Sequence, residues 1–184
     1  MHVLGISGSL RRDSHNSLLL RAAAEHLPRG VELELWDGLR DVPPYDEDDD
    51  VEPAPAAVAS LRRAVAGADA VLIATPEYNS SVPGALKNAL DWASRPFASN
   101  VFRNKPVVVI GASSGVFGAV WAQAELRKVL GTMGARVVDA EVAVGRAAEK
   151  LDADGELVDH EVRDQLREAL AALHPGAAMF SAAA

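Results

Sequence analysis

Three continuously apolar stretches limit the folds open to this chain more than any other feature. They are VLGI at 3–6, VLIA at 71–74 and VVVI at 107–110. A strand that is apolar on both faces is covered by helices on both sides, as happens in parallel sheets. Two further stretches, 31–35 and 138–142, alternate apolar with acidic residues, which is typical of strands with one wet face. The sequence therefore predicts a parallel sheet between two layers of helices, with the alternating strands at its edges.

Helical periodicity fills the intervals between these stretches. Leu86, Ala89, Leu90 and Ala93, for example, recur at the i, i+3, i+4 and i+7 positions of one helix face. The predicted strands are 2–7, 31–36, 69–75, 106–112 and 136–144. The predicted helices are 15–27, 54–66, 83–94, 118–133 and 158–173. With the alternating strands at the edges, the order is 2-1-3-4-5, a five-stranded, flavodoxin-like, doubly wound α/β sheet.

The length of 184 residues suits one domain with a sizeable core. We expect a single domain over 1–174 and a loosely ordered tail over 175–184, which is rich in small residues. No apolar run reaches membrane-spanning length and no signal-peptide pattern opens the chain, so we expect a cytoplasmic protein without a membrane partner. The net charge of −8 argues against a nucleic-acid partner, because phosphate backbones attract clustered Lys and Arg.

The chain contains no cysteine, which removes disulfides, thiolate nucleophiles and cysteine-ligated metals. Its five histidines are scattered without metal-ligand spacing. The acidic stretch 46–50 lacks the glycine turn and distal glutamate of an EF-hand loop, so a solvated loop is favoured over a calcium site. We therefore predict no metal site, and any redox chemistry must come from a bound organic cofactor.

The loop after the first strand has the composition of a phosphate site. Ligands of open α/β sheets bind beyond the carboxyl ends of the strands, where the strand order reverses. There the segment 7–17 offers a tight glycine turn, a helix start whose N–H groups attract anions, and the side chains of Ser9, Arg11, Ser14 and Asn16. It matches neither a Walker A loop nor GxGxxG, so we predict a monophosphate site. The alternative is that Ser14 simply caps the helix.

The loops after the third and fourth strands converge on the same edge. In the first of these, Glu77, Tyr78 and Asn79 lie between two prolines that stiffen the turn, which suits a flat heterocycle. The alternative is a decorated turn with Asn79 and Ser80 as turn residues. The second, 112–118, combines two serines with two glycines, so its backbone N–H groups can approach a ligand closely.

Two segments resemble the NADPH-dependent FMN reductase family of the flavodoxin-like superfamily. The family pattern G-S-L-R-x-x-S-x-N is matched at 8–16, and P-E-Y-N-x-S-x-P-G-x-L-K-N-A-x-D-W is matched at 76–92. The likeness covers nearly the whole chain. It implies FMN as cofactor, NADPH or NADH as co-substrate, and a small-molecule acceptor of the quinone-like, azo, flavin or metal-oxyanion type.

The resemblance also assigns roles to the three loops. It places the FMN phosphate on Ser9, Arg11, Ser14 and Asn16. It places the isoalloxazine against Pro76, Glu77, Tyr78 and Asn79, with the pyrimidine edge near Ser113, Ser114 and Gly115. It implies ping-pong chemistry, in which NAD(P)H gives a hydride to flavin N5 and leaves before the acceptor takes the electrons. No side chain is therefore expected to be catalytic. A homodimer or homotetramer with the site at a subunit boundary is implied as well.

Two aromatic residues depart from the family pattern. Phe117 stands in a turn that is often Gly-Gly in the family, and Trp121 takes the place of an arginine. The pair could change acceptor choice or assembly, whereas packing of Trp121 in the core is the alternative.

Two other functions remain open at this stage. The chain could be a flavin-binding electron carrier reduced by a partner protein, in which case NAD(P)H would not reduce it directly. It could also be a partner-binding module without flavin. Substitution of Arg11 and Asn79 should abolish flavin retention in a flavoprotein and change nothing in such a module.

Overall fold

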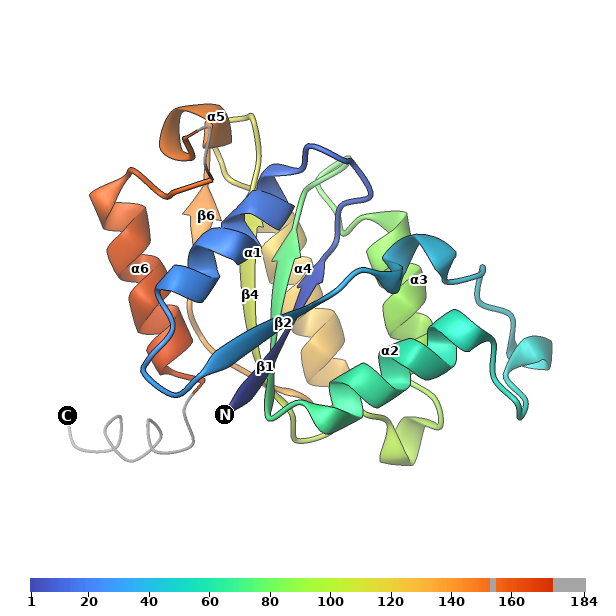
Figure 1. Ribbon diagram of the computed structural model, residues 1–184. Helices are drawn as coiled ribbons and strands as arrows, with labels where there is room; N and C mark the ends of the chain where they lie inside the picture. Colours follow the sequence, from blue (N-terminus) through green and yellow to red (C-terminus); the bar gives the residue numbers. More distant parts are fainter. Residues whose placement is uncertain (153–154, 174–184) are drawn as a thin grey trace.

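The computed structural model describes residues 1–152 and 155–173, which form a parallel sheet between two helical layers (Figure 1). The order is β2-β1-β3-β4-β5, with β6 also paired to β4. The strands are β1 (His2–Ser7), β2 (Glu32–Trp36), β3 (Ala70–Thr75), β4 (Pro106–Ala112), β5 (Arg136–Val137) and β6 (Ala143–Val144). The predicted fold class and strand order are thereby confirmed.

Each face of the sheet has its own apolar core. On one face, α1 (His15–Glu25) and α6 (His160–Ala171) cover the central strands with buried leucines. On the other face lie α2 (Ala56–Gly67), α3 (Gly84–Ala93) and α4 (Val120–Thr132). The fully buried β3 needs both layers, as its unbroken apolar sequence predicts. The helices begin and end within two residues of the predicted bounds.

In the described part of the chain, four shorter helical elements lie in the connections between the strands and the longer helices. A one-turn helix, α5 (Ala147–Lys150), comes after β6. Three 3₁₀ turns, η1 (Gly38–Asp41), η2 (Glu47–Asp49) and η3 (Phe97–Ser99), sit in the connections, and none of these four elements was predicted. In the acidic stretch, Asp50 forms an ion pair with Arg62 at 2.8 Å.

The predicted continuous strand over 136–144 is wrong. It is divided into β5 and β6, which pair with opposite ends of β4. Between them the backbone turns on itself, because the Ala140 N–H donates to the Val138 carbonyl at 3.0 Å. The side chain of Arg127 donates to the Ala140 carbonyl at 3.2 Å. An edge segment can leave the ladder when its backbone groups find such partners, which alternation of side chains does not reveal.

The predicted boundary between the domain and the C-terminal tail stays a prediction. The expected tail, 175–184, lies outside the described residues, as does residue 174, where the single domain was predicted to end. Within 1–152 and 155–173, none of the helices is both long enough and apolar enough to cross a membrane.

Candidate functional site

The carboxyl ends of β1, β3 and β4 meet at one edge of the sheet (Figure 1). The loops that follow these strands line a cavity of about 100 Å³. All the predicted site residues line it except Asn79 and Gly115. The lining residues are Ser9, Arg11, Ser14, His15, Asn16, Pro76, Glu77, Tyr78, Ala112, Ser113 and Ser114. A second hollow, of about 280 Å³, lies beside it and shares Arg11 and Tyr78.

The first loop is built around the start of α1. Ser14 is the N-cap, and its Oγ accepts from the N–H groups of Asn16 and Ser17 at 3.2 and 3.3 Å. The alternative reading of Ser14 as a cap is therefore confirmed as its structural role. Its hydroxyl hydrogen is still free to donate, so capping and ligand binding are compatible. At the other end of the loop, the Gly8 N–H donates to the Ala74 carbonyl at 2.8 Å and ties the loop to β3.

Asn16 joins the first loop to the third. Its side chain is 3% exposed, and its amide spans both backbone groups of Ala112. Nδ2 donates to the Ala112 carbonyl at 2.9 Å, and Oδ1 accepts from the Ala112 N–H at 2.9 Å. These two hydrogen bonds therefore fix the position of the first loop relative to the third. The predicted direct contact of Asn16 with phosphate is not tested by this geometry and stays a prediction.

His15 lines the same cavity and was missed in the sequence. Its Nδ1 is buried, and no hydrogen-bond partner for it lies in the described part of the chain. Buried polar atoms without partners are rare, and those in a ligand cavity commonly meet the ligand. Its place, directly after the N-cap serine, was the signal that could have found it.

The second loop is a tight turn that presents Tyr78. Tyr78 and Ser81 exchange two backbone hydrogen bonds, of 3.2 and 3.1 Å. Between them Asn79 and Ser80 have φ of 53° and 59°, the positive values of a two-residue type I′ turn, which asparagine tolerates well. The reading of Asn79 and Ser80 as turn residues is thus confirmed. A cofactor contact by Asn79 stays a prediction, since it lies outside the lining of either hollow.

Glu77 links the second loop to α4. Its Oε2 accepts from the N–H groups of Trp121 and Ala122, both at 3.0 Å. A carboxylate at a helix N-terminus is stabilised by the free N–H groups and by the helix dipole. Glu77 therefore positions α4 against the cavity, and its negative charge is already matched there.

Glu125 supports the far side of the same turn and was also missed. Its Oε2 accepts from Ser81 Oγ at 2.6 Å and from the Val82 N–H at 3.2 Å. These hydrogen bonds, that from Ser81 first, lower the pKa of Glu125 below its ordinary value of 4.5.

The support from Glu125 should depend on pH. Because its folded-state pKa is lowered, its contribution to stability is present above pH 4.5 and is lost as the pH falls through the folded pKa. We expect Glu125→Gln to lower the melting temperature at pH 7, and the gap from the wild type to narrow steadily below pH 4.5. Thermal unfolding at pH 7, 5 and 3.5 checks this. An equal gap at every pH would contradict it.

Hydrogen bonds with β6 and the residues after it hold the third loop in place. The Ser113 N–H donates to the Val144 carbonyl at 3.0 Å, and the Gly115 carbonyl accepts from the Arg146 N–H at 2.8 Å. The N–H groups of Ser114 and Gly115 make no hydrogen bond within 1–152 and 155–173. Two donors beside the cavity are thus left for a ligand.

Close backbone contacts fix the outer part of this loop, 115–118. Gly118 has φ of 60°, and a Cβ there would lie 2.4 Å from the Ala143 carbonyl carbon. A Cβ on Gly145 would lie 1.9 Å from the Val116 carbonyl oxygen. Neither glycine can carry a side chain without moving the backbone, so this part of the loop requires glycine at both positions.

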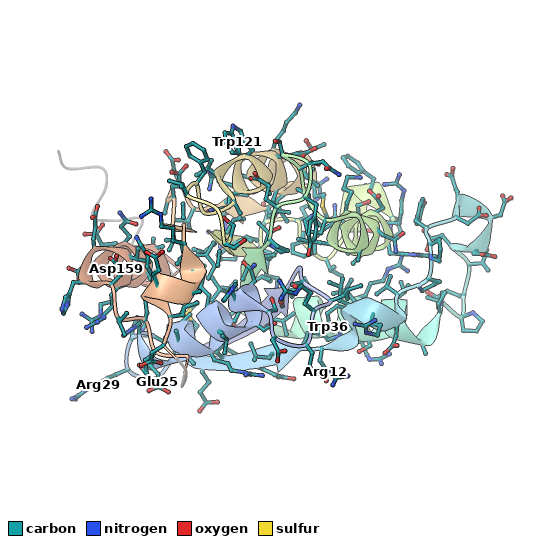
Figure 2. The ribbon with its side chains drawn as sticks, turned by 90° about the horizontal axis from the view of Figure 1, so that it is seen from above. Arg12, Glu25, Arg29, Trp36, Trp121 and Asp159 are labelled. Atoms are coloured by element: carbon teal, nitrogen blue, oxygen red, sulfur yellow. The ribbon has the colours of Figure 1, made fainter. Side chains whose placement is uncertain are left out.

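Phe117 and Trp121 are held at the surface as a pair. Their ring centroids lie 5.0 Å apart in an edge-on arrangement. Phe117 is 62% exposed and Trp121 48% exposed, so the alternative of core packing for Trp121 is wrong. Figure 2 shows Trp121 projecting outward from α4, far from Trp36, which lies at the end of β2.

The residues present fit FMN. The phosphate end has the Arg11 guanidinium, which has no partner in the described part of the chain, together with two hydroxyls and the buried His15 Nδ1. The free N–H groups of Ser114 and Gly115 suit the polar edge of a flavin ring. The neighbouring hollow adds apolar surface from Leu10, Pro83 and Ala85.

Comparison with known proteins identifies the family. The sequence profile of the NADPH-dependent FMN reductase family matches residues 1–149. An NAD(P)H-dependent FMN reductase of Pseudomonas aeruginosa is 44% identical over 172 residues, covering 93% of this chain and 92% of that protein. A 2-hydroxy-1,4-benzoquinone reductase of a Burkholderia species is 38% identical, with 88% of each chain covered.

A solved structure shares the whole fold. The flavoenzyme NAD(P)H:acceptor oxidoreductase FerB of Paracoccus denitrificans superposes with a TM-score of 0.83 at 37% identity, covering 94% of each chain. The fold, the three converging loops and the profile match agree, and the chain belongs to the NADPH-dependent FMN reductase family.

Proposed function

We infer that this chain binds FMN at the three-loop cavity and passes electrons from NAD(P)H to a quinone-like acceptor. The observation that carries this is the convergence of most of the predicted phosphate and ring residues on one cavity. The buried His15 Nδ1, which has no hydrogen-bond partner among the described residues, lies in the same cavity. The relatives named as FMN and benzoquinone reductases support the same chemistry.

The chain's own groups would bind and orient the cofactor. FMN, when bound, supplies the redox chemistry by accepting a hydride from NAD(P)H and releasing electrons to the acceptor. Arg11, Ser9 and Ser14 would hold its phosphate beside the positive start of α1. The N–H groups of Ser114 and Gly115 would donate to the polar edge of the ring, where donors stabilise developing negative charge. No proton-transferring side chain is needed.

The acceptor is proposed at the level of a class. Quinone-like compounds are favoured because a benzoquinone is named for one relative, whereas azo compounds, flavins and metal oxyanions are the other acceptors expected from the sequence. A flavodoxin-like electron carrier is the alternative function, and direct reduction by NAD(P)H separates the two.

A homodimer or homotetramer is proposed for the assembly. Val116, Phe117 and Trp121 expose 63%, 62% and 48% of their surfaces beside the site, and Tyr78 exposes 52%. Exposed apolar clusters of this kind commonly mark interfaces. Sedimentation equilibrium of the purified protein tests this. A cytoplasmic location is also proposed, because that compartment supplies NAD(P)H.

The deciding experiment is the visible spectrum of the purified protein with FMN under anaerobic conditions, before and after NADPH. The proposed function requires a bound-flavin spectrum that bleaches on addition of NADPH. A bound flavin that does not bleach would favour the electron carrier. Failure to bind FMN would overturn both functions.

A further inference from the structure

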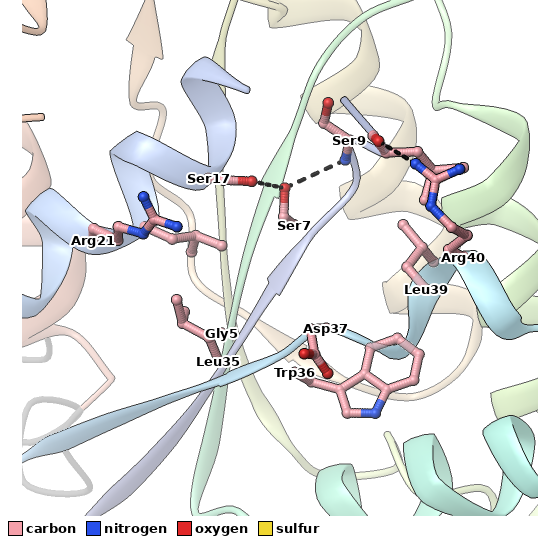
Figure 3. A pocket seen from close by; sticks show the side chains of 12 residues that line it. Gly5, Ser7, Ser9, Ser17, Arg21, Leu35, Trp36, Asp37, Leu39 and Arg40 are labelled. Atoms are coloured by element: carbon pink, nitrogen blue, oxygen red, sulfur yellow. Dashed lines mark hydrogen bonds between the residues drawn. The ribbon is translucent and has the colours of Figure 1, made fainter. Parts of the chain in front are cut away.

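A second cavity lies behind the first loop, on the side away from the proposed FMN phosphate (Figure 3). It measures about 220 Å³ and opens between α1, β2 and η1. Ser9 lines both this cavity and the cofactor cavity, while Leu10 lines this one and the hollow next to the cofactor cavity. The loop therefore separates two cavities, and no layer of packed side chains from the described residues fills the space behind it.

Hydrogen bonds fix the two ends of this loop but hardly its middle. Gly8 is tied to β3, and Ser14 is tied to α1. Between them, within 1–152 and 155–173, residues 10–13 receive one hydrogen bond from outside the loop. Arg40 Nη2 donates it to the Leu10 carbonyl at 2.6 Å. The neighbouring Arg11 N–H donates only locally, to Ser9 Oγ at 3.3 Å.

Arg40 is well placed to act as an anchor. It lies on η1, whose Leu39 is 5% exposed and belongs to the core on the α2 face. Just before η1, Trp36 Nε1 donates to Ser60 Oγ at 3.3 Å, which ties the end of β2 to α2. In Figure 3 the Arg40 side chain reaches the loop from the opposite side of the cavity to Arg21.

We propose that Arg40 is a positioning residue for the cofactor phosphate. By holding the Leu10 carbonyl across the cavity, it fixes the backbone of the residue next to it, Arg11, so that this guanidinium faces the phosphate. Without Arg40, the middle of the loop can move into the hollow behind it. The inference rests on the proposed FMN site but concerns a residue outside the three loops that form that site.

The test compares Arg40→Ala with Arg63→Ala. Both changes remove one exposed arginine, and Arg63 has no side-chain partner within the described residues. Each protein is titrated with FMN and with riboflavin, which has the same ring and ribityl chain but no phosphate. Arg40→Ala should weaken FMN binding about tenfold, the size expected for a charge-assisted hydrogen bond, and leave riboflavin binding unchanged. Arg63→Ala should change neither.

Amide hydrogen exchange of the cofactor-free proteins gives a second readout. The Arg11 amide, which donates to Ser9 Oγ, should exchange faster in Arg40→Ala than in Arg63→Ala, while the core of β1 exchanges equally in both. The inference is overturned if the two variants bind FMN equally, or if FMN and riboflavin binding weaken together. Equal exchange of the Arg11 amide in the two variants would overturn it too. If the wild type fails to bind FMN, the proposed function is overturned instead. The exchange measurement still tests whether Arg40 holds the first loop in place.

Discussion

Asn16→Ala should lower the free energy of unfolding by about 3 kcal/mol, although it removes little apolar surface. Its amide serves both backbone groups of Ala112, and the side chain is 3% exposed. Truncation leaves a buried N–H and a buried carbonyl without partners, and each such group costs about 1–3 kcal/mol. The same change separates the first loop from the third, so FMN affinity should fall with stability.

Urea unfolding measures the loss, with Gln165→Ala as the matched control. Gln165 is also an amide on a helix, but its hydrogen bond to Glu161 is exposed and 3.5 Å long. The control should therefore stay within about 0.5 kcal/mol of the wild type. Asn16→Asp should also destabilise, because a carboxylate would face the Ala112 carbonyl in place of the Nδ2 donor. Equal stability of Asn16→Ala and the control would contradict this account.

Local pattern was enough to predict the sheet and the edge at which the three loops meet. The unbroken apolar run of β3 could only be a strand covered on both sides, and the alternation in β2 marked an edge. Once the order was known, the loops after β1, β3 and β4 had to meet at one edge. Most of the residues predicted in them do line one cavity.

Partners distant in the sequence could not be predicted in the same way. Glu77 was expected to contact the flavin ring, and Glu125 was given no role. Each of them accepts two hydrogen bonds from a segment more than forty residues away. Their roles depend on how α4 lies against the second loop, which periodicity does not specify. The strand predicted at 136–144 failed for a related reason, because the Arg127 side chain and a local turn satisfy its backbone.

Arg11→Ala should weaken FMN binding by about 10- to 100-fold, the range expected for losing a hydrogen bond to a charged phosphate. The Arg11 side chain lines the cofactor cavity and has no protein partner in the described part of the chain, so nothing else shares its charge. Stability without cofactor should therefore stay within about 0.5 kcal/mol of the wild type, which separates this variant from Asn16→Ala. Riboflavin binding should hardly change, because the missing contact is to the phosphate.

Arg12→Ala is the matched control for this prediction. Arg12 is the next residue in the same loop and is also exposed, but it lies outside the lining of the cofactor cavity and projects away from the ribbon (Figure 2). FMN titration by flavin fluorescence at low and high salt compares the two. The loss in Arg11→Ala should shrink as salt rises, because ions screen the contact between guanidinium and phosphate. Equal FMN affinity in the two variants would move the phosphate away from Arg11 and leave the helix start, with Ser14 and His15, as its remaining site.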